Sequence, residues 1–237
     1  MRSAKHIKLS VRVLLAVGLL TLPCVSHGTS QKNTTLEENE GVIFSDVPSN
    51  LNPKARYLFY LQGYIVEAGN TRPTSPKFGV YEYQQILETF ERSGFAVISE
   101  PRKKTPNIEP GAVKVAEQIR QLLKAGVPPQ HITVVGASQG SWIAMLASTY
   151  LGNGNVNFVL IAACSADEGF LKLVNLHGKV LSIYEKSDLA QSCQSYRTDA
   201  TGISEWKEVA INTGLKHGFL YRPIKEWTEP TIAWARR

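Results

Sequence analysis

Apolar-rich runs of strand length alternate with amphipathic stretches along most of the chain. The strand-like runs lie at residues 56–61, 95–99, 132–135, 158–163, 179–184 and 206–211. The continuous ones are typical of strands buried on both faces of a parallel sheet. Apolar positions at helical spacing predict helices over 80–92, 112–124, 141–148 and 224–236. This alternation predicts an α/β fold with a doubly wound, mostly parallel sheet flanked by helices.

The first 28 residues follow a different pattern. Four cations without an acid lead into an almost wholly apolar stretch at 13–22, which ends in small residues. This order is typical of a secretory signal peptide, whose apolar core is too short for a stable membrane span. We therefore expect cleavage near Ser26 or Gly28 and a periplasmic or secreted protein. Lipid anchoring at Cys24 is an alternative that its preceding Leu-Pro pair disfavours.

Length and charge then bound what the mature chain can be. Residues 29–50 are expected to form a flexible segment, and residues 51–237 are long enough for one core but short for two domains. The chain has 26 Lys and Arg against 20 Asp and Glu, and loss of the four leader cations lowers its net charge from +6 to +2. Nucleic acid or an anionic membrane surface is therefore not an expected partner.

Two cysteines remain after the leader, Cys164 and Cys193. An isolated pair in an oxidising compartment is more often bridged than free, and no neighbouring residues have metal-site spacing. Each cysteine follows a predicted strand, and those strands are neighbours. The pattern favours a disulfide that holds the loop after the strand at 179–184.

The candidate chemistry centres on the sequence Gly136-Ala137-Ser138-Gln139-Gly140, between a predicted strand and a predicted helix. A strand that turns through G-x-S-x-G into a helix is a nucleophile elbow, which exposes the serine on a tight turn. The alternative is that Ser138 only caps the helix. Histidine and carboxylate partners at the same edge of the sheet would decide between the two.

Position relative to the strands selects those partners. Ligands of a parallel α/β sheet bind at the carboxyl ends of its strands. His131 and His177 precede their strands, whereas His217 follows the last one in a glycine-flanked loop. Asp188 follows the strand at 179–184, with Asp167 and Glu185 as rival acids. The order Ser138, Asp188, His217 predicts a nucleophile, an orienting acid and a base.

From about residue 56 to 221 the chain resembles an α/β-hydrolase, on the elbow at 136–140, the acid loop at Asp188 and the loop at His217-Gly218. The resemblance implies an oxyanion hole of two backbone N–H groups, those of Gln139 and Tyr64. Many members have His-Gly before the second donor, where this chain has Gln62-Gly63. The resemblance implies neither a metal nor an organic cofactor.

The expected rim of the site is short on one side and long on the other. The interval 164–178 has room for little more than one helix over 168–176, so a lid is expected to be small or absent. The long loop at 67–78 brings Glu67 and Arg72 to the rim. Arg72 either holds an anionic group of the substrate or pairs with Glu67 to order the loop.

These residues predict an exported serine hydrolase that cleaves small carboxylic esters through an acyl-enzyme on Ser138. A peptidase or an acyltransferase would use the same apparatus. A binding module on the same fold is the alternative outside catalysis, although the complete set of three residues argues against it. The acyl group, the leaving group and the oligomeric state are left open.

Overall fold

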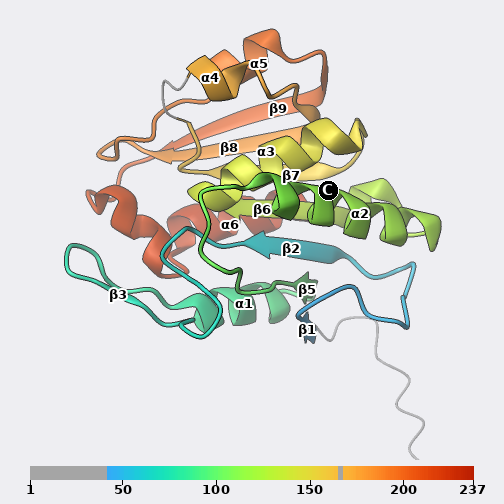
Figure 1. Cartoon of the computed structure of the whole chain (residues 1–237), viewed down its shortest axis with the longest axis horizontal. Helices are drawn as coiled ribbons and strands as arrows, with labels where there is room; N and C mark the ends of the chain where they lie inside the picture. The colour runs from blue at the N-terminus through green and yellow to red at the C-terminus, as the bar shows by residue number, and fades with distance from the viewer. Residues whose placement is uncertain (1–41, 165–167) are drawn as a thin grey trace, which may run out of the picture. The chain divides into compact units, whose positions relative to one another are not determined.

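The computed structural model describes residues 42–164 and 168–237, whose centre is a seven-stranded parallel sheet with helices on both faces (Figure 1). The strand order is β1-β5-β2-β6-β7-β8-β9. The strands are β1 (Val42–Phe44), β2 (Tyr57–Leu61), β5 (Ala96–Ile98), β6 (Ile132–Ala137), β7 (Asn157–Ile161), β8 (His177–Glu185) and β9 (Gly202–Ile211). A separate antiparallel pair is formed by β3 (Thr74–Ser75) and β4 (Gly79–Val80).

The helices divide between the two faces of this sheet. One face packs against α2 (Glu109–Lys124) and α3 (Gln139–Leu151), and the other against α1 (Tyr83–Glu91) and α6 (Lys225–Ala235). The shorter helices are α4 (Glu168–Leu171), α5 (Gln194–Asp199) and the 3-10 turns η1 (Pro129–His131) and η2 (Lys216–Tyr221). The predicted helix over 168–176 is thus a single short turn, α4.

Strand β2 shows why its sequence is apolar throughout. Tyr57, Phe59 and Leu61 pack into the core beneath α2 and α3, whereas Leu58 and Tyr60 pack into the core on the opposite face. All five side chains are buried. A strand covered on both faces has no solvent side, so polar residues would lose their hydration without gain.

The predicted sheet is confirmed, and the parallel pairing extends to every strand pair of the described seven-stranded sheet. One boundary differs. The sequence places residues 42–50 in a flexible segment, but Val42–Phe44 forms edge strand β1, which pairs with β5 in parallel. A run of three apolar residues is too short to show an alternating pattern. The predicted signal peptide and residues 29–41 lie outside the described residues.

No helix within residues 42–164 and 168–237 is long and apolar enough to cross a membrane.

Candidate active site

Ser138 occupies a strained turn between β6 and α3. Its backbone φ is +53°, a left-handed conformation that few residues other than glycine adopt. A Cβ on Gly140 would lie 1.8 Å from the Leu61 carbonyl oxygen, and one on Gly136 would lie 2.5 Å from the Gly140 carbonyl oxygen. Only glycine fits at these two positions, so the spacing G-x-S-x-G follows from the turn's close packing.

A second serine fixes the elbow to the neighbouring strand. The Ser141 hydroxyl is fully buried, lies 2.6 Å from the Gly136 carbonyl oxygen and accepts the Ile161 N–H at 3.0 Å. The Ser138 N–H donates to the Ile161 carbonyl oxygen at 2.9 Å. The end of β7 therefore holds both sides of the turn. Sequence reasoning missed Ser141, which reads as an ordinary small residue of a buried helix.

Three side chains from three different loops meet at the carboxyl edge of the sheet. His217 Nε2 lies 3.0 Å from Ser138 Oγ, and His217 Nδ1 lies 2.7 Å from Asp188 Oδ2. The Asp188 side chain is 5% exposed and that of His217 is 30% exposed. A carboxylate can only accept, so Nδ1 carries the ring proton and Nε2 is free to accept from the serine hydroxyl. The contacts expected from the order of the strands are therefore present.

Glu185, one of the two rival acids, has a different part in the structure. Its carboxylate is fully buried and accepts hydrogen bonds from the N–H and hydroxyl of Ser187 and of Thr213. Burial raises the pKa of Glu185, but these four hydrogen bonds lower it by more, so the carboxyl pKa lies below its usual range. Glu185 thus joins the loop after β8 to the loop after β9. Asp167 lies outside the described residues.

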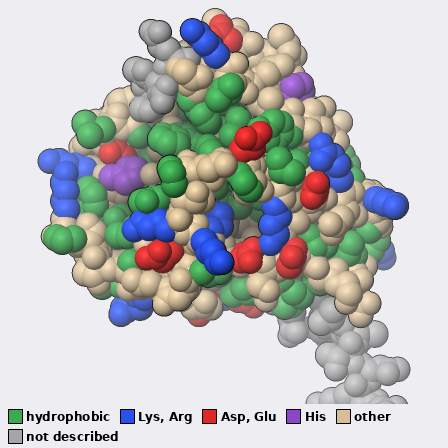
Figure 2. All heavy atoms as spheres, in the orientation of Figure 1, with side chains coloured by type: hydrophobic (Ala, Val, Ile, Leu, Met, Phe, Trp, Pro, Cys, Tyr) green, Lys and Arg blue, Asp and Glu red, His purple; other side chains and the backbone are tan. Residues whose placement is uncertain are grey.

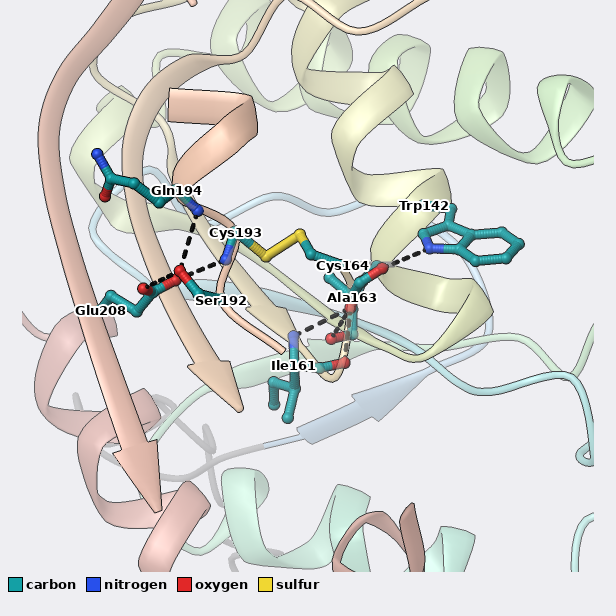
Figure 3. Close-up of a disulfide and its surroundings, with 10 residues drawn as sticks. Trp142, Ile161, Ala163, Cys164, Ser192, Cys193, Gln194 and Glu208 are labelled. Atoms are coloured by element: carbon teal, nitrogen blue, oxygen red, sulfur yellow. Dashed lines mark hydrogen bonds between the residues drawn. A yellow bond between two sulfur atoms is a disulfide. The ribbon is translucent and has the colours of Figure 1, made fainter. Parts of the chain in front are cut away.

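The disulfide expected between Cys164 and Cys193 is present (Figure 3). Its Cα atoms are 5.2 Å apart, and the bridge spans a sequence separation of 29 residues that includes Asp188. The Cys193 N–H donates to Glu208 on β9, and the indole of Trp142 donates to the Ala163 carbonyl oxygen at 2.6 Å. The bridge therefore anchors the far end of the acid loop beside β7.

The two expected oxyanion donors flank the serine. Gln139 is the first residue of α3, directly after Ser138. Gly63, which precedes Tyr64, packs against the serine, because a Cβ placed on Gly63 would lie 3.6 Å from Ser138 Cβ. Neither N–H has a backbone acceptor among the described residues.

Of the two alternatives for Arg72, the pairing with Glu67 is wrong. Arg72 instead makes a bidentate ion pair with Glu82, with N···O distances of 3.0 and 2.7 Å. Glu67 lies in a tight turn, in which its backbone N–H and carbonyl groups exchange hydrogen bonds with those of Asn70. The β3-β4 hairpin between Arg72 and Glu82 brings this pair together, and sequence spacing alone does not show that hairpin.

Beside the oxyanion donors lies a cavity of about 460 Å³. It is lined by Tyr64 and Gln139, by apolar side chains of β2 and by the loop that precedes α2.

Within the described part of the chain, no group of three or more His, Cys, Asp or Glu side chains has the arrangement of a metal site.

Comparison with solved structures defines the class of fold. The chain is similar to an esterase/lipase from an uncultured bacterium, with a TM-score of 0.55 and 14% identity over 77% of this chain and 75% of that one. It is similar to EstE5 soaked with p-nitrophenyl butyrate, with a TM-score of 0.55 and 13% identity over 77% and 75%. It is also similar to a protein of unknown function from Agrobacterium tumefaciens that is described as an α/β hydrolase. The TM-score is 0.53 and the identity is 18%, over 80% of this chain and 88% of that one.

No family model and no curated protein matches the sequence. The chain has the α/β-hydrolase fold, at low sequence identity to these neighbours.

Proposed function

We propose that this protein is an exported serine hydrolase that cleaves carboxylic esters of small molecules. The observation that carries the proposal is the hydrogen-bonded chain from Ser138 through His217 to Asp188, with the serine on a strained elbow. A serine hydroxyl is a weak nucleophile, and a correctly oriented imidazole is what activates it. A serine that only capped α3 would need neither contact.

Each group has a defined step in this proposal. His217 Nε2 takes the proton from Ser138 Oγ as the oxygen attacks the ester carbonyl, and Asp188 keeps the ring in the required tautomer. The N–H groups of Gln139 and Tyr64 hold the developing oxyanion, and one such donor contributes about 3 kcal/mol in related enzymes. His217 then gives the proton to the leaving alcohol. Water repeats the sequence on the acyl-enzyme.

Two further observations support the substrate class and the location. EstE5, a protein of similar fold, was soaked with a p-nitrophenyl ester. The Cys164–Cys193 disulfide is of a kind that persists in an oxidising compartment, and the predicted leader at residues 1–28 would direct the protein to such a compartment. A peptidase or acyltransferase would share the same first steps, so substrate panels have to separate these activities.

A fluorophosphonate probe tests the nucleophile directly. We expect the wild-type protein to be labelled and Ser138→Ala to remain unlabelled, and we expect the variant to lose ester hydrolysis by on the order of 10⁵-fold or more. Asp188→Asn should lose about 10⁴-fold, mainly in kcat, because the imidazole tautomer is no longer fixed. The readout is turnover of ester, amide and acyl-acceptor panels by each protein.

Ser204→Ala serves as a control, since the hydroxyl of this exposed serine on β9 donates to the Gly154 carbonyl oxygen and has no part in the contacts of Ser138, Asp188 and His217. It should keep the label. Unlabelled wild type, or equal labelling of Ser138→Ala, would contradict the proposal and favour a binding module.

A further inference from the structure

The cavity beside the oxyanion donors has no part in the steps described so far. It is lined by Phe59 and Leu61 of β2 and by residues of the loop at 100–108, which passes the carboxyl end of β2 in Figure 1. Gln139 binds this loop through its side chain, which donates to the Thr105 carbonyl oxygen at 3.2 Å. Tyr64 and Gln139, the two expected oxyanion donors, both line this cavity.

One cation of the cavity wall lacks a carboxylate partner. Arg102 donates one N–H to Gln62 Oε1 at 3.0 Å and another to the Gln62 carbonyl oxygen. A guanidinium has five N–H groups, and the others have no partner among the described residues. No carboxylate of residues 42–164 and 168–237 lies within ion-pair distance of it.

The neighbouring charges are already compensated or exposed. Basic and acidic side chains gather in the middle of the face drawn in Figure 2. Lys114 pairs with Glu100 at 2.5 Å and lies 3.7 Å from Asp46. Lys104 lies over the Tyr64 ring, 4.7 Å from its centre, and Lys103 is exposed. Arg102 is the partly buried member of this group whose charge is not matched.

A cation removed from water without a counter-ion is unfavourable, and proteins normally pair such a group. Burial lowers the pKa of Arg102, which shows the same loss of solvation. Gln62 supplies only neutral acceptors. A counter-ion carried by a ligand in the cavity would complete the site.

We propose that Arg102 binds a carboxylate of the substrate, so that this hydrolase prefers esters with a free carboxylate near the scissile bond. The planar guanidinium fork matches a carboxylate in a bidentate geometry. A single unmatched cation suits a monoanion better than a doubly charged phosphate. The inference rests on the proposed esterase function, and its test below separates the two.

The position of Arg102 also bounds the length of the substrate. The Gln62 carbonyl that Arg102 binds lies within two residues of the Tyr64 N–H, and two residues of chain span roughly 7 Å at most. The carboxylate site and the oxyanion site are therefore separated by only a few bond lengths of substrate. Half-esters of short dicarboxylic acids fit this spacing.

Matched ester pairs test the proposal. Monomethyl glutarate is compared with the methyl ester of glutaric acid monoamide, which replaces the carboxylate by a neutral group of the same shape. The butyrate esters of glycolate and of glycolamide make the same comparison on the alcohol side. We expect the wild type to prefer one of the two carboxylates on the order of tenfold or more in kcat/KM. The pair that responds shows which side of the ester enters the cavity.

The variants assign the preference to Arg102. Arg102→Gln should remove the preference, and Arg102→Lys should keep part of it, because the charge remains but the fork is lost. Arg120→Gln is the matched control, since this exposed arginine on α2 donates, within the described part of the chain, only to the Tyr150 carbonyl oxygen. Arg72→Gln tests the competing rim site, whose charge Glu82 already neutralises.

Three outcomes would overturn the proposal. They are a wild type without preference for either carboxylate, equal losses on charged and neutral esters in Arg102→Gln, and loss of the preference in Arg72→Gln. Equal losses would mean that Arg102 only positions the loop at 62–64.

Calorimetric titration with glutaramate, a monoanion in which an amide replaces the ester, keeps the test independent of turnover. Glutaramate should bind wild type and Ser138→Ala, and should bind Arg102→Gln on the order of tenfold more weakly or not at all. If no ester is hydrolysed but glutaramate binds through Arg102, the proposed function fails and the anion site stands. If esters are hydrolysed but glutaramate does not bind, the anion site fails alone.

Discussion

At the scale of single residues, backbone strain gathers where the candidate chemistry lies. Three residues other than glycine have positive φ in the described chain, Ser138, Ala162 and Lys216. Ser138 is the candidate nucleophile, Ala162 follows β7, and Lys216 directly precedes His217. Such conformations cost of order 1–3 kcal/mol each and persist only where surrounding contacts enforce them. Backbone strain therefore lowers the stability of the fold at Ser138 itself and at Lys216, directly before His217.

Gly140→Ala should disable the elbow. The new Cβ would lie 1.8 Å from the backbone oxygen of Leu61, so β2 or α3 has to move. We expect unfolding free energy to fall by about 3 kcal/mol or more, together with loss of fluorophosphonate labelling. Urea unfolding followed by circular dichroism measures the first and the probe measures the second.

Gly154→Ala is the matched control, because its added Cβ would meet nothing closer than 3.9 Å. It should change stability by less than about 1 kcal/mol and keep the label. A Gly140→Ala protein as stable and reactive as wild type would contradict the account of the elbow.

Site residues could be predicted from the sequence where their position relative to the strands was sufficient to place them. Ser138, Asp188 and His217 all follow strands of a parallel sheet, so the strand order alone brought them to one edge. Arg102 could not be found in this way. Its interest lies in the absence, among the described residues, of a carboxylate within ion-pair distance. That property depends on how the loop at 100–108 folds.

At the scale of elements, the acid loop and the histidine loop form one unit through Glu185. Its carboxylate receives two N–H and two O–H donors, and the Ser187 hydroxyl in turn accepts the Lys216 N–H at 3.1 Å. Lys216 precedes His217, and Ser187 precedes Asp188. The distance between Asp188 and His217 therefore depends on a buried carboxylate that touches neither. The sequence analysis considered Glu185 only as a rival acid, because spacing does not distinguish a carboxylate that joins two loops from one that orients a histidine.

Glu185→Gln should destabilise the protein and loosen the triad. The amide NH₂ would face a backbone or hydroxyl donor, so at least one hydrogen bond to the charged group is lost without replacement, at about 2 kcal/mol. We expect kcat to fall more than KM rises, since the loss lies in alignment. Urea unfolding at pH 7 and steady-state kinetics measure the two effects.

The pH dependence gives this prediction a sign. Hydrogen bonds hold the folded-state pKa of Glu185 below its usual range. Its contribution is therefore fully present above the unfolded pKa of about 4.3 and is lost as pH falls through the folded value. The stability gap between wild type and Glu185→Gln should shrink below about pH 4. A gap that widens in acid would show that Glu185 is not ionised in the folded protein.

At the scale of the whole molecule, the parallel sheet explains both what the sequence predicted and what it did not. Buried strands such as β2 and β6 are recognisable in the sequence from their runs of mostly apolar residues. Because the strands are parallel, the loops that follow them all lie at the carboxyl edge of the sheet. Edge strand β1 has only three residues, and the β3-β4 hairpin has two in each strand. Elements this short are set by tertiary contacts rather than by local pattern, and the pairing of Arg72 with Glu82 depends on one of them.

The disulfide bears on the fold, on the candidate site and on the proposed export, and reduction tests its part in each. Closing a loop of 29 residues stabilises a protein by about 3–4 kcal/mol in the chain-entropy model. Reductant should therefore lower the Tm of the wild type by about 10 °C. Because the closed loop contains Asp188, kcat should also fall, by up to about 100-fold if the carboxylate shifts by an ångström. Calorimetry and ester kinetics with and without dithiothreitol measure these effects.

The double variant Cys164→Ser/Cys193→Ser should match the reduced wild type and should not respond to reductant. Wild type produced with residues 1–28 and exported should behave as the oxidised protein, whereas protein produced without them in the cytosol should resemble the double variant until it is oxidised. Reductant leaving Tm and kcat of the exported protein unchanged would contradict the role given to the bridge. If the cytosolic protein already has the bridge and its full activity, the disulfide gives no support to export.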